Sequence, residues 1–140
     1  MPRRAHSGTV VVIGLGRFGE SVARKLASAG REVMVIDPDP ALIAQVAPAV
    51  TLAAEADGTS LQVLRDLGVE DCGVAVVAIG EDLEASILAT AALADLGVTE
   101  IWARAVTDAH GRILERVGAH WIVKPEQLMG ERVAQLIYTG

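Results

Sequence analysis

The sequence predicts a doubly wound α/β fold, in which six parallel strands form one sheet with helices on both faces. Short apolar runs alternate with segments of helical periodicity along most of the 140 residues, and such strands pair in parallel through right-handed crossovers. Hydrophobic residues make up 51% of the chain but aromatic residues only 3%, a mixture typical of strands buried on both faces. Glycines that can end a helix in the left-handed conformation follow four predicted helices, at Gly30, Gly68, Gly97 and Gly118.

The predicted elements follow one another with short connections. The six strands are short and apolar, and they cover Thr9–Gly14, Glu32–Asp37, Val50–Ala54, Val74–Ile79, Glu100–Ala105 and His120–Val123. Five helices lie between them and cover Arg17–Ala29, Pro40–Ala47, Ser60–Leu67, Leu83–Leu96 and Ala109–Val117. Because strand and helix alternate without interruption, we expect one sheet and one domain.

The last segment, KPEQLMGERVAQLIYTG, departs from this alternation because no strand follows it. A helix is predicted from Pro125 onward, with apolar residues on roughly one face at Leu128, Met129, Val133, Leu136 and Ile137. This helix covers the edge of the sheet, contacts a partner subunit as a crossover or dimerisation helix would, or leads to a second domain. The expected organisation is a tail over 1–8 with a small basic start at Arg3 and Arg4, an α/β domain over 9–124 and an interface helix over 125–140.

Charge and composition disfavour several classes of function. The net charge is −6, which argues against binding to nucleic acid or to an anionic membrane surface. No apolar run approaches the roughly 18 residues needed to cross a bilayer, so no direct membrane insertion is expected. Cys72 is the only cysteine, which leaves no internal disulfide. We therefore expect a soluble, cytoplasmic protein.

A glycine-rich turn follows the first predicted strand and opens the first predicted helix. Gly14, Gly16 and Gly19 form the pattern G-x-G-x-x-G. The first glycine permits the tight turn, the second lets the backbone approach phosphate oxygens, and the third allows close packing of helix and strand. Unpaired N–H groups at the helix start then face the anion. In this context the pattern predicts a Rossmann-like nucleotide site, which includes the intervening Leu15 and Phe18.

An acidic residue ends the second predicted strand, at Asp37, with Pro38 beside it. A carboxylate at this position accepts hydrogen bonds from both ribose hydroxyls and repels a 2′-phosphate. This disfavours NADP and leaves NAD, ATP, ADP or AMP. Asp39 is a competing acid, but its position after Pro38 favours capping of the next helix. We therefore assign Asp37 and Pro38 to the nucleotide site.

The ends of the third and fourth predicted strands complete the site, because ligands of open α/β sheets bind at the carboxyl ends of the strands. In the segment ADGTS, Asp57 either accepts from an adenine amino group or fixes a turn, with Gly58 and Thr59 beside it. The fourth strand ends at the expected switch point with groups that would face the base or sugar, at Ala78, Ile79 and Gly80. Glu81 and Asp82 favour the positive end of the next helix.

Two arginines occupy positions where a permanent positive charge can contact an anion. Arg17 lies within the glycine loop, where it either contacts a triphosphate tail or a neighbouring subunit's ligand, or is solvated in the first helical turn. Arg104 lies in IWARAV, a strand that we expect to be largely buried, so it needs a carboxylate or a phosphate as its counter-anion. Both arginines are assigned to the nucleotide site.

Groups that would make this chain an enzyme are missing from the sequence. It contains no Tyr-x-x-x-Lys pair, no G-x-S-x-G elbow, no G-x-x-x-x-G-K-[ST] loop and no H-E-x-x-H motif. His6, His110 and His120 lack ligand-like spacing, and surface or capping roles are expected for them. No residues remain for a substrate domain. The sequence therefore predicts a binding module without catalytic activity.

Five segments in order resemble the N-terminal lobe of RCK domains, also called KTN or TrkA-N domains. They are GLGRFG, the acidic end of the second strand, ADGTS, VVAIGEDLEAS and IWARAV. With VGAHWIVKPEQLMGERVAQ the similarity narrows to regulatory subunits of Ktr and Trk potassium uptake systems, and it covers nearly all of residues 8 to 140. The resemblance implies a nucleotide sensor that gates a membrane potassium-translocating subunit. It also implies a homodimer within an octameric ring, in the cytoplasm and peripheral to the inner face of the cell membrane.

The resemblance further implies roles for individual residues. The glycine loop would hold the phosphates, Asp37 the ribose, and Asp57 with residues 78–80 the adenosine. Arg17 would reach the terminal phosphate across a dimer interface. Glu126, in KPEQLMG, would help to place a divalent or monovalent cation beside the triphosphate, although Pro followed by Glu is also ordinary at a helix start.

Two departures from the family pattern limit these expectations. Family regulators normally carry a second lobe, so the 140 residues are either a fragment or lack that lobe. In addition, Ala-Asp-Gly-Thr stands where Gly-Asp-Ala-Thr is commoner. ATP or ADP is the expected ligand, with NAD, NADH or AMP as alternatives. Two other functions use the same site: an NAD-dependent oxidoreductase fragment, and a nucleotide-binding subunit of a cation–proton antiporter. Trp102 and Trp121 would contribute either to the dimer interface or to the core.

Overall fold

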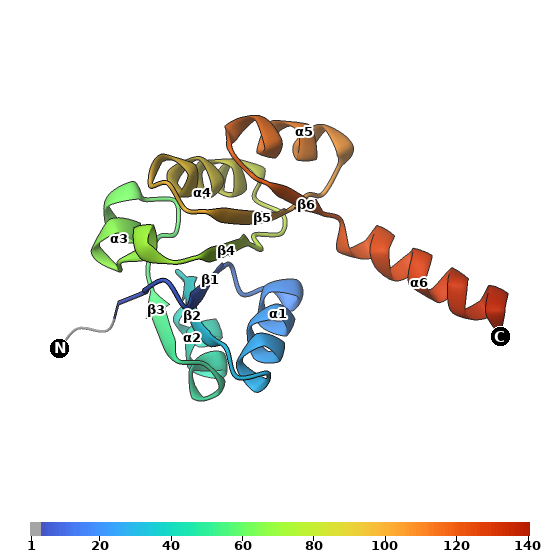
Figure 1. The fold of residues 1–140 in the computed structure, drawn as a ribbon, viewed down its shortest axis with the longest axis horizontal. Helices are drawn as coiled ribbons and strands as arrows, with labels where there is room; N and C mark the ends of the chain where they lie inside the picture. Colours follow the sequence, from blue (N-terminus) through green and yellow to red (C-terminus); the bar gives the residue numbers. More distant parts are fainter. Residues whose placement is uncertain (1–3) are drawn as a thin grey trace.

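The computed structural model describes residues 4–140, so Arg3 and the rest of residues 1–3 of the expected tail lie outside the described part of the chain. The fold is one six-stranded parallel sheet with the strand order β3-β2-β1-β4-β5-β6 (Figure 1). The strands are β1 (Thr9–Ile13), β2 (Glu32–Asp37), β3 (Leu52–Glu55), β4 (Val74–Val77), β5 (Glu100–Arg104) and β6 (Trp121–Val123). Since the chain crosses from β3 back to β4 beside β1, the switch point lies between β1 and β4, and the predicted doubly wound fold is confirmed.

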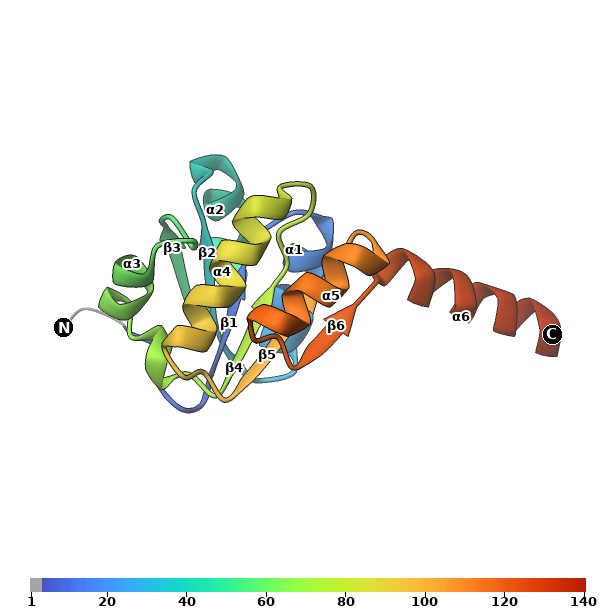
Figure 2. The ribbon, with the colours of Figure 1, turned by 90° about the horizontal axis from the view of Figure 1, so that it is seen from above.

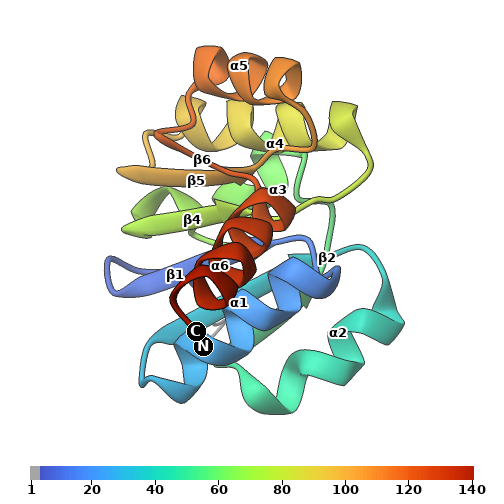
Figure 3. The ribbon, with the colours of Figure 1, turned by 90° about the vertical axis from the view of Figure 1, so that its right-hand side faces the viewer.

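Helices cover both faces of this sheet (Figures 1 and 3). The helices are α1 (Arg17–Ser28), α2 (Pro40–Val46), α3 (Leu61–Asp66), α4 (Leu83–Asp95), α5 (Asp108–Val117) and α6 (Pro125–Thr139), with short 3₁₀ turns at Ala47–Ala49 and Val69–Asp71. α1 and α2 lie on one face, whereas α3, α4 and α5 lie on the other. Alternate residues of each central strand therefore point into two different cores, which is why the strands read as unbroken apolar runs.

The two cores differ in size. The core under α3, α4 and α5 is the larger one and contains Met34, Ile36, Leu64, Leu93 and Ile101, all fully buried. The core under α1 and α2 is built mainly from small and β-branched residues such as Val10, Val12, Val33 and Val35, with Ala23 of α1. As the composition predicts, aliphatic packing and not aromatic packing holds the sheet and its helices together.

Side chains and glycines mark the ends of most helices. Four helices begin at a side-chain cap, and the capping residues are Asp39, Ser60, Asp82 and Thr107. The capping role predicted for Asp39 and the helix-start role predicted for Asp82 are thus confirmed. The predicted positive φ angles also occur, at Gly30, Gly68, Gly97 and Gly118. Side-chain caps and glycines together explain why the helix ends could be placed to within a few residues.

Several strands are shorter than predicted. β1 and β4 stop before the residues that turn toward the ligand edge of the sheet, Gly14 and Ala78, and Gly14 has a φ of 99°. β3 begins later than predicted because the turn Ala47–Ala49, which contains Pro48, delays the return of the chain to the sheet. These differences leave the topology unchanged and lengthen the loops that carry the site.

The last helix, α6, projects away from the sheet and its helices (Figures 1 and 2). None of its residues is buried. Even large apolar side chains are exposed, such as Met129 at 65% and Ile137 at 75%. No helix among residues 4–140 has both the length and the apolar character that a membrane crossing requires. The apolar side of α6 therefore has no covering element within the described chain.

The two tryptophans form a stacked pair on neighbouring strands. Trp102 of β5 and Trp121 of β6 stack on each other, with ring centroids 5.4 Å apart and planes inclined by 25°. Trp102 packs against the core under α1, whereas Trp121 is 54% exposed, so the stack lies half inside the core and half on the surface.

In the expected tail, Ala5 is buried and donates its N–H to the Leu67 carbonyl, and Arg4 pairs with Glu70.

Candidate nucleotide-binding site

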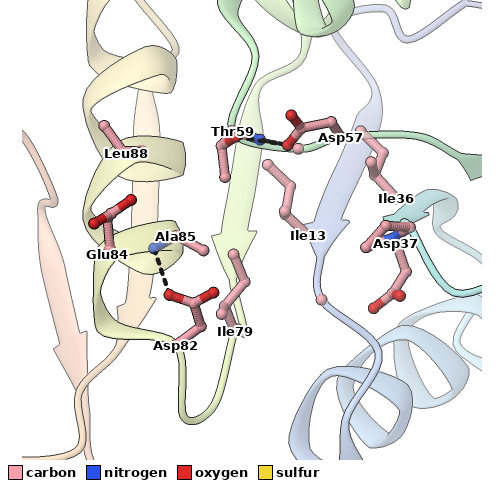
Figure 4. A pocket seen from close by; sticks show the side chains of 13 residues that line it. Ile13, Ile36, Asp37, Asp57, Thr59, Ile79, Asp82, Glu84, Ala85 and Leu88 are labelled. Carbon is pink, nitrogen blue, oxygen red and sulfur yellow. Dashed lines mark hydrogen bonds between the residues drawn. The ribbon is translucent and has the colours of Figure 1, made fainter.

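A pocket of about 470 Å³ opens at the carboxyl ends of β1, β2, β3 and β4 (Figure 4). Seven residues assigned to the site from the sequence line it: Gly14, Asp37, Pro38, Asp57, Gly58, Thr59 and Ile79. The pocket therefore lies at the switch point, where the connections after β1 and β4 leave in opposite directions. This is the position at which open α/β sheets bind their ligands.

The three glycines of the loop differ in what surrounds them. A Cβ on Gly19 would overlap the carbonyl oxygen of Gly14 and lie 3.0 Å from Ala78 Cβ, so the third glycine is needed for α1 to pack against the switch point. Gly14 has a φ of 99°, which the tight turn requires. A Cβ on Gly16 would meet nothing within 4 Å. Protein packing thus explains the first and third glycines, and the space at the second is free for a ligand.

The start of α1 presents backbone donors beside this free space. Gly16 is the N-cap residue, and no side chain caps the helix. The first N–H groups of a helix have no partner within the helix, and together with the helix dipole they attract an anion. The first intrahelical bond runs from Glu20 N–H to the Gly16 carbonyl. The N–H groups of Arg17, Phe18 and Gly19 are therefore available to a phosphate group.

Asp37 connects the glycine loop to the end of β2. Its side chain is 8% exposed, and its two carboxylate oxygens accept from the N–H groups of Leu15 and Asp39, each at 2.8 Å. Two backbone donors fix the carboxylate, while each oxygen keeps a further acceptor position. Asp37 is therefore held in place at the pocket wall before any ribose hydroxyl approaches.

Asp57 fixes a turn at the end of β3. One carboxylate oxygen accepts from the Thr59 N–H at 2.9 Å and from the Thr59 hydroxyl at 2.6 Å. These hydrogen bonds, first the side-chain one and then the backbone one, lower the pKa of Asp57 and keep it ionised. The turn-fixing role that we left open for Asp57 is thus present, and its second oxygen remains an acceptor at the pocket. Beside it, Gly58 approaches Ile13 too closely for any side chain.

The end of β4 brings Gly80 against Arg104. A Cβ on Gly80 would lie 2.6 Å from Arg104 Nη1, so the guanidinium crosses directly over this glycine. Arg104 Nε is buried and has no hydrogen-bond partner among the described residues. Arg104 as a whole is half-buried, and it forms no ion pair with a carboxylate of the described chain, which suits an arginine that binds an anionic ligand.

A second, smaller cavity of about 310 Å³ is lined in part by Arg104. The loop after β5, Lys124 and the first turn of α6 line it, including Glu126, which is exposed. No group of three or more His, Cys, Asp and Glu side chains suited to a metal occurs among residues 4–140. The acidic residues that line this cavity are Glu126 and Asp108, and Asp108 pairs with Lys124, so a cation there would need further ligands from outside the described chain.

Some residues assigned to the site from the sequence lie outside the pocket. The side chains of Leu15 and Phe18 pack into the core under α1 and α2, so only their backbone groups face the loop. Ala78 is buried behind Ile79. Arg17 is exposed and has no ion-pair partner among the described residues. The sequence pattern therefore did not distinguish the residues of the loop whose side chains pack in the core from those that face the open space.

Six pocket residues were not assigned to the site from the sequence: Ile13 and Ile36 on β1 and β2, Asp82 at the N-cap of α4, and Glu84, Ala85 and Leu88 on α4. Asp82 accepts from the Ala85 N–H at 3.0 Å, so one residue both caps α4 and lines the pocket. With Asp37 and Asp57, the lining contains four acidic side chains and no basic one. The signal for this was the acidic segment GEDLE directly after the fourth strand.

His110 differs from its expected surface or capping role. Its side chain is 2% exposed, and its ring lies between α4 and α5, with Nε2 3.0 Å from Ser86 Oγ. The error arose because His110 follows the helix start closely, but α5 turns that position toward α4. The capping role is performed by Thr107, whose hydroxyl accepts the His110 N–H. His120 Nδ1 accepts the Ile101 N–H at a sheet edge, a capping-type contact.

The strand order, the glycine turn and the pocket at the switch point define a Rossmann-like domain of the nucleotide-binding class. Residues 10–125 match the TrkA-N domain family. The chain belongs to this family, which is the N-terminal lobe of RCK domains that the sequence motifs resemble.

Two curated relatives extend this assignment. The chain is 42% identical over 129 residues to Ktr system potassium uptake protein C of Bacillus subtilis (strain 168), an alignment that covers 92% of this chain and 58% of that protein. It is 38% identical over 124 residues to Ktr system potassium uptake protein A of the same organism, covering 89% and 56%. The chain thus spans somewhat more than half the length of the curated relatives that it matches.

Solved structures show the same fold at low sequence identity. The NAD(P)-binding domain of an exopolyphosphatase-related protein from Archaeoglobus fulgidus superimposes with a TM-score of 0.83 and 22% identity, over 94% of this chain and 98% of that chain. The GsuK channel bound to NAD gives 0.76 and 19%, over 91% and 22%. GsuK bound to ADP gives 0.71 and 19%, over 86% and 31%. At these identities the likeness establishes the fold.

Proposed function

We propose that this chain is a nucleotide-sensing regulatory domain that controls a membrane potassium-translocating subunit. In this proposal ATP or ADP is the preferred ligand, and NAD, NADH or AMP compete for the same site. The domain changes shape on binding and performs no chemistry on the nucleotide. The names of the Ktr relatives support potassium uptake as the process, and the GsuK complexes support NAD and ADP as ligand classes for this fold.

The observation that carries nucleotide binding is the free space at Gly16. A side chain there would meet no protein atom within 4 Å, and uncapped N–H groups of α1 border the same space. Phosphate is the ligand group that this combination fits best, because backbone N–H groups and the helix dipole both favour an anion. Asp37, held by two backbone donors, would accept the ribose hydroxyls.

The charged side chains around the site favour a ligand that carries a further phosphate, in addition to the one bound by the N–H groups of α1. Arg17 is exposed and free of ion pairs in residues 4–140, which suits contact with a phosphate bound in a second copy of the chain. Arg104 contributes a buried, unpartnered Nε at Gly80. The four acidic side chains that line the pocket would repel a bare triphosphate, so we expect a cation to accompany ATP. Glu126 would supply one ligand to it, and the phosphates the others.

We further propose that the working unit is a homodimer, assembled in the full regulator into an octameric ring. α6 carries exposed apolar residues along its length at Leu128, Met129, Val133, Leu136 and Ile137. On the face that carries α1, an apolar cavity of about 620 Å³ lies between that helix and β4 and β5, bordered by Val76, Trp102 and Leu128. The helices that pack against β4, β5 and β6, namely α4 and α5, lie on the opposite face. The apolar side of α6 from a second copy would match this open face in its apolar character.

Gating then follows from differential affinity. A nucleotide shifts the equilibrium between two dimer shapes only by the ratio of its affinities for them. ATP and ADP differ in the terminal phosphate, and Arg17 of one copy would contact that phosphate in the other. The membrane subunit would respond to the resulting change in dimer shape, with the domain held on the cytoplasmic side, peripheral to the membrane.

Calorimetric titration of the purified chain with ATP, ADP, AMP, NAD and NADH, with and without Mg²⁺, tests this proposal. We expect ATP or ADP to bind at least about tenfold tighter than NADH, a difference of about 1.4 kcal/mol. A clear preference for NADH would instead favour a reader of redox state or an oxidoreductase fragment. Absence of binding by every nucleotide would overturn the proposal.

A matched pair of variants tests the role of Arg17. Arg17→Ala is expected to weaken ATP at least about tenfold and AMP less than about twofold, since AMP lacks the terminal phosphate. Arg24→Ala is the control, because Arg24 lies on the same helix but pairs with Glu20 away from the glycine loop. Equal losses of ATP and AMP affinity in Arg17→Ala would refute the contact with the terminal phosphate.

A further inference from the structure

A polar bridge between α4 and α5 is buried in the larger core. Ser86 of α4 is fully buried and His110 of α5 is 2% exposed, and Ser86 Oγ lies 3.0 Å from His110 Nε2. On the other side of the ring, His110 Nδ1 accepts the N–H of Val106 at 3.0 Å. One imidazole therefore connects a helix to a loop through two hydrogen bonds, beside a core built mainly from apolar side chains.

The two hydrogen bonds determine the protonation state of the ring. A backbone N–H can only donate, so Nδ1 must be the unprotonated nitrogen that accepts from Val106. The proton is then on Nε2, which donates to Ser86 Oγ. Both ring nitrogens are satisfied in this neutral tautomer, and an unsatisfied polar group in such a core would be costly.

The charges around the ring maintain this state. Burial lowers the pKa of His110, and the positive charge of Arg104 on β5 lowers it further. Asp108 and Lys124, the nearby charged residues of α5 and of the segment before α6, pair with each other at the surface. The carboxylate side of that pair is exposed, so it does not compensate a charge on the ring. The bridge is thus a neutral connection of fixed length at neutral pH.

The ends of the bridge lie at two different places of functional interest. Ser86 is in the first turns of α4, whose residues Asp82, Glu84 and Ala85 line the nucleotide pocket. Val106 is in the loop between β5 and α5, which lines the second cavity together with Arg104, Lys124 and Glu126. The bridge therefore joins the wall of the pocket to the loop against which α6 begins.

We propose that the Ser86–His110–Val106 bridge couples nucleotide occupancy at α4 to the position of the β5–α5 loop and the first turn of α6. Ser86 and His110 are positioning residues in this proposal, because neither lines the pocket. A displacement of α4 by the nucleotide passes through the ring to the Val106 N–H, and from there to the cavity that contains Arg104 and Glu126. The inference rests on the proposed nucleotide binding but adds a path from the ligand to α6.

Hydrogen exchange with and without ATP, in the wild-type chain and in variants, tests this coupling. In the wild type, ATP is expected to slow exchange in residues 105–108 and 124–130 at least about fivefold, because ordering of a segment lowers its opening equilibrium. Ser86→Ala removes the hydroxyl and is expected to keep the ATP Kd within about twofold while it reduces that protection to less than about twofold.

Two further variants separate coupling from general stability. His110→Asn retains an acceptor for the Val106 N–H but cannot reach Ser86, and it is expected to uncouple the segments in the same way. Thr90→Val is the matched control, because Thr90 is buried on the same helix and bonds only to the Ser86 carbonyl of α4 itself. It removes a buried hydroxyl without breaking the bridge, and the response to ATP is expected to persist.

The outcomes are distinct. Undiminished protection of both segments by ATP in Ser86→Ala and His110→Asn would overturn the coupling, and so would equal loss in Thr90→Val, which would indicate a merely structural role. Absence of any ATP response in the two wild-type segments, despite binding, would overturn it as well. If ATP, ADP and NADH all fail to bind the wild type in calorimetry, the failure belongs to the proposed function itself.

Discussion

The first and the last helices both carry apolar residues at helical spacing, but they lie in opposite environments. α1 has 12 residues and buries Gly19 and Ala23 against the sheet, whereas α6 has 15 residues and buries none. α1 is held so closely that a single methyl group would not fit at Gly19, while a Cβ at Gly130 of α6 would meet nothing. The comparison teaches that apolar spacing predicts a helix but not the surface that covers it. For α1 that surface is in the chain; for α6 we place it in a second copy.

The largest expected contrast comes from the glycines of the two helices. Gly19→Ala forces a methyl group against the Gly14 carbonyl oxygen and Ala78, and we expect it to lower the free energy of unfolding by about 2–3 kcal/mol. Gly130→Ala should raise helix stability by about 0.5–1 kcal/mol instead. Urea unfolding followed by circular dichroism measures both. Similar effects of the two substitutions would break the comparison.

Truncation of one leucine in each helix gives a second, smaller contrast between α1 and α6. Leu26 of α1 is half-buried in the core under that helix, so Leu26→Ala should cost about 1.5 kcal/mol of unfolding free energy. Leu136→Ala on exposed α6 should leave unfolding of dilute protein unchanged and weaken self-association. Chemical denaturation and sedimentation equilibrium give the two readouts. Loss of stability without loss of association in Leu136→Ala would show that α6 folds back on its own domain.

The start of α1 should affect binding and not stability. Gly16 has φ −66° and ψ −173°, angles that alanine adopts, so Gly16→Ala should change the unfolding free energy by less than about 1 kcal/mol. The added methyl group occupies the free space beside the loop, and nucleotide affinity should fall at least about tenfold, or about 1.4 kcal/mol. Gln127→Ala, at the exposed start of α6, is the control. Unchanged affinity in Gly16→Ala would show that phosphate does not approach here.

Acid should destabilise the sheet and its helices through the buried His110. The unfolded chain binds a proton on this residue near pH 6.5, whereas burial lowers the pKa in the folded state. The unfolded state therefore holds more protons as the pH falls below 6.5, and stability should decrease by up to about 1 kcal/mol per pH unit. His110→Asn should flatten this dependence between pH 6.5 and 5.5. A slope identical to that of the wild type would assign the titration to another group.

Much of the fold could be predicted because its determinants are local. Apolar runs, the caps at Asp39 and Asp82 and the glycine turn at Gly14 each act within a few residues of the chain. The strand order and the pocket at the switch point then follow from general rules for parallel sheets. Asp37 belongs to this group, since its role depends on its place at the end of a strand.

The rest depended on contacts between distant segments. The burial of His110 requires α5 to pack on α4, and the crossing of Arg104 over Gly80 requires two strand ends to meet. Neither contact has a local signature. The sequence did contain one indication of the contact with His110. The helix at Leu83–Asp95 is apolar on nearly every side, so its polar residues Ser86 and Thr90 are expected to be buried and to need hydrogen-bond partners.

The stacked indoles on β5 and β6 have a practical consequence. Trp102 and Trp121 are the protein's only tryptophans, and they form one pair, of which one ring borders the apolar cavity and the other is 54% exposed. All indole emission of the chain therefore originates from a single small area beside α6. The intrinsic tryptophan fluorescence therefore reports on this area without an attached dye, because its emission wavelength and intensity change with the exposure of the two rings to water.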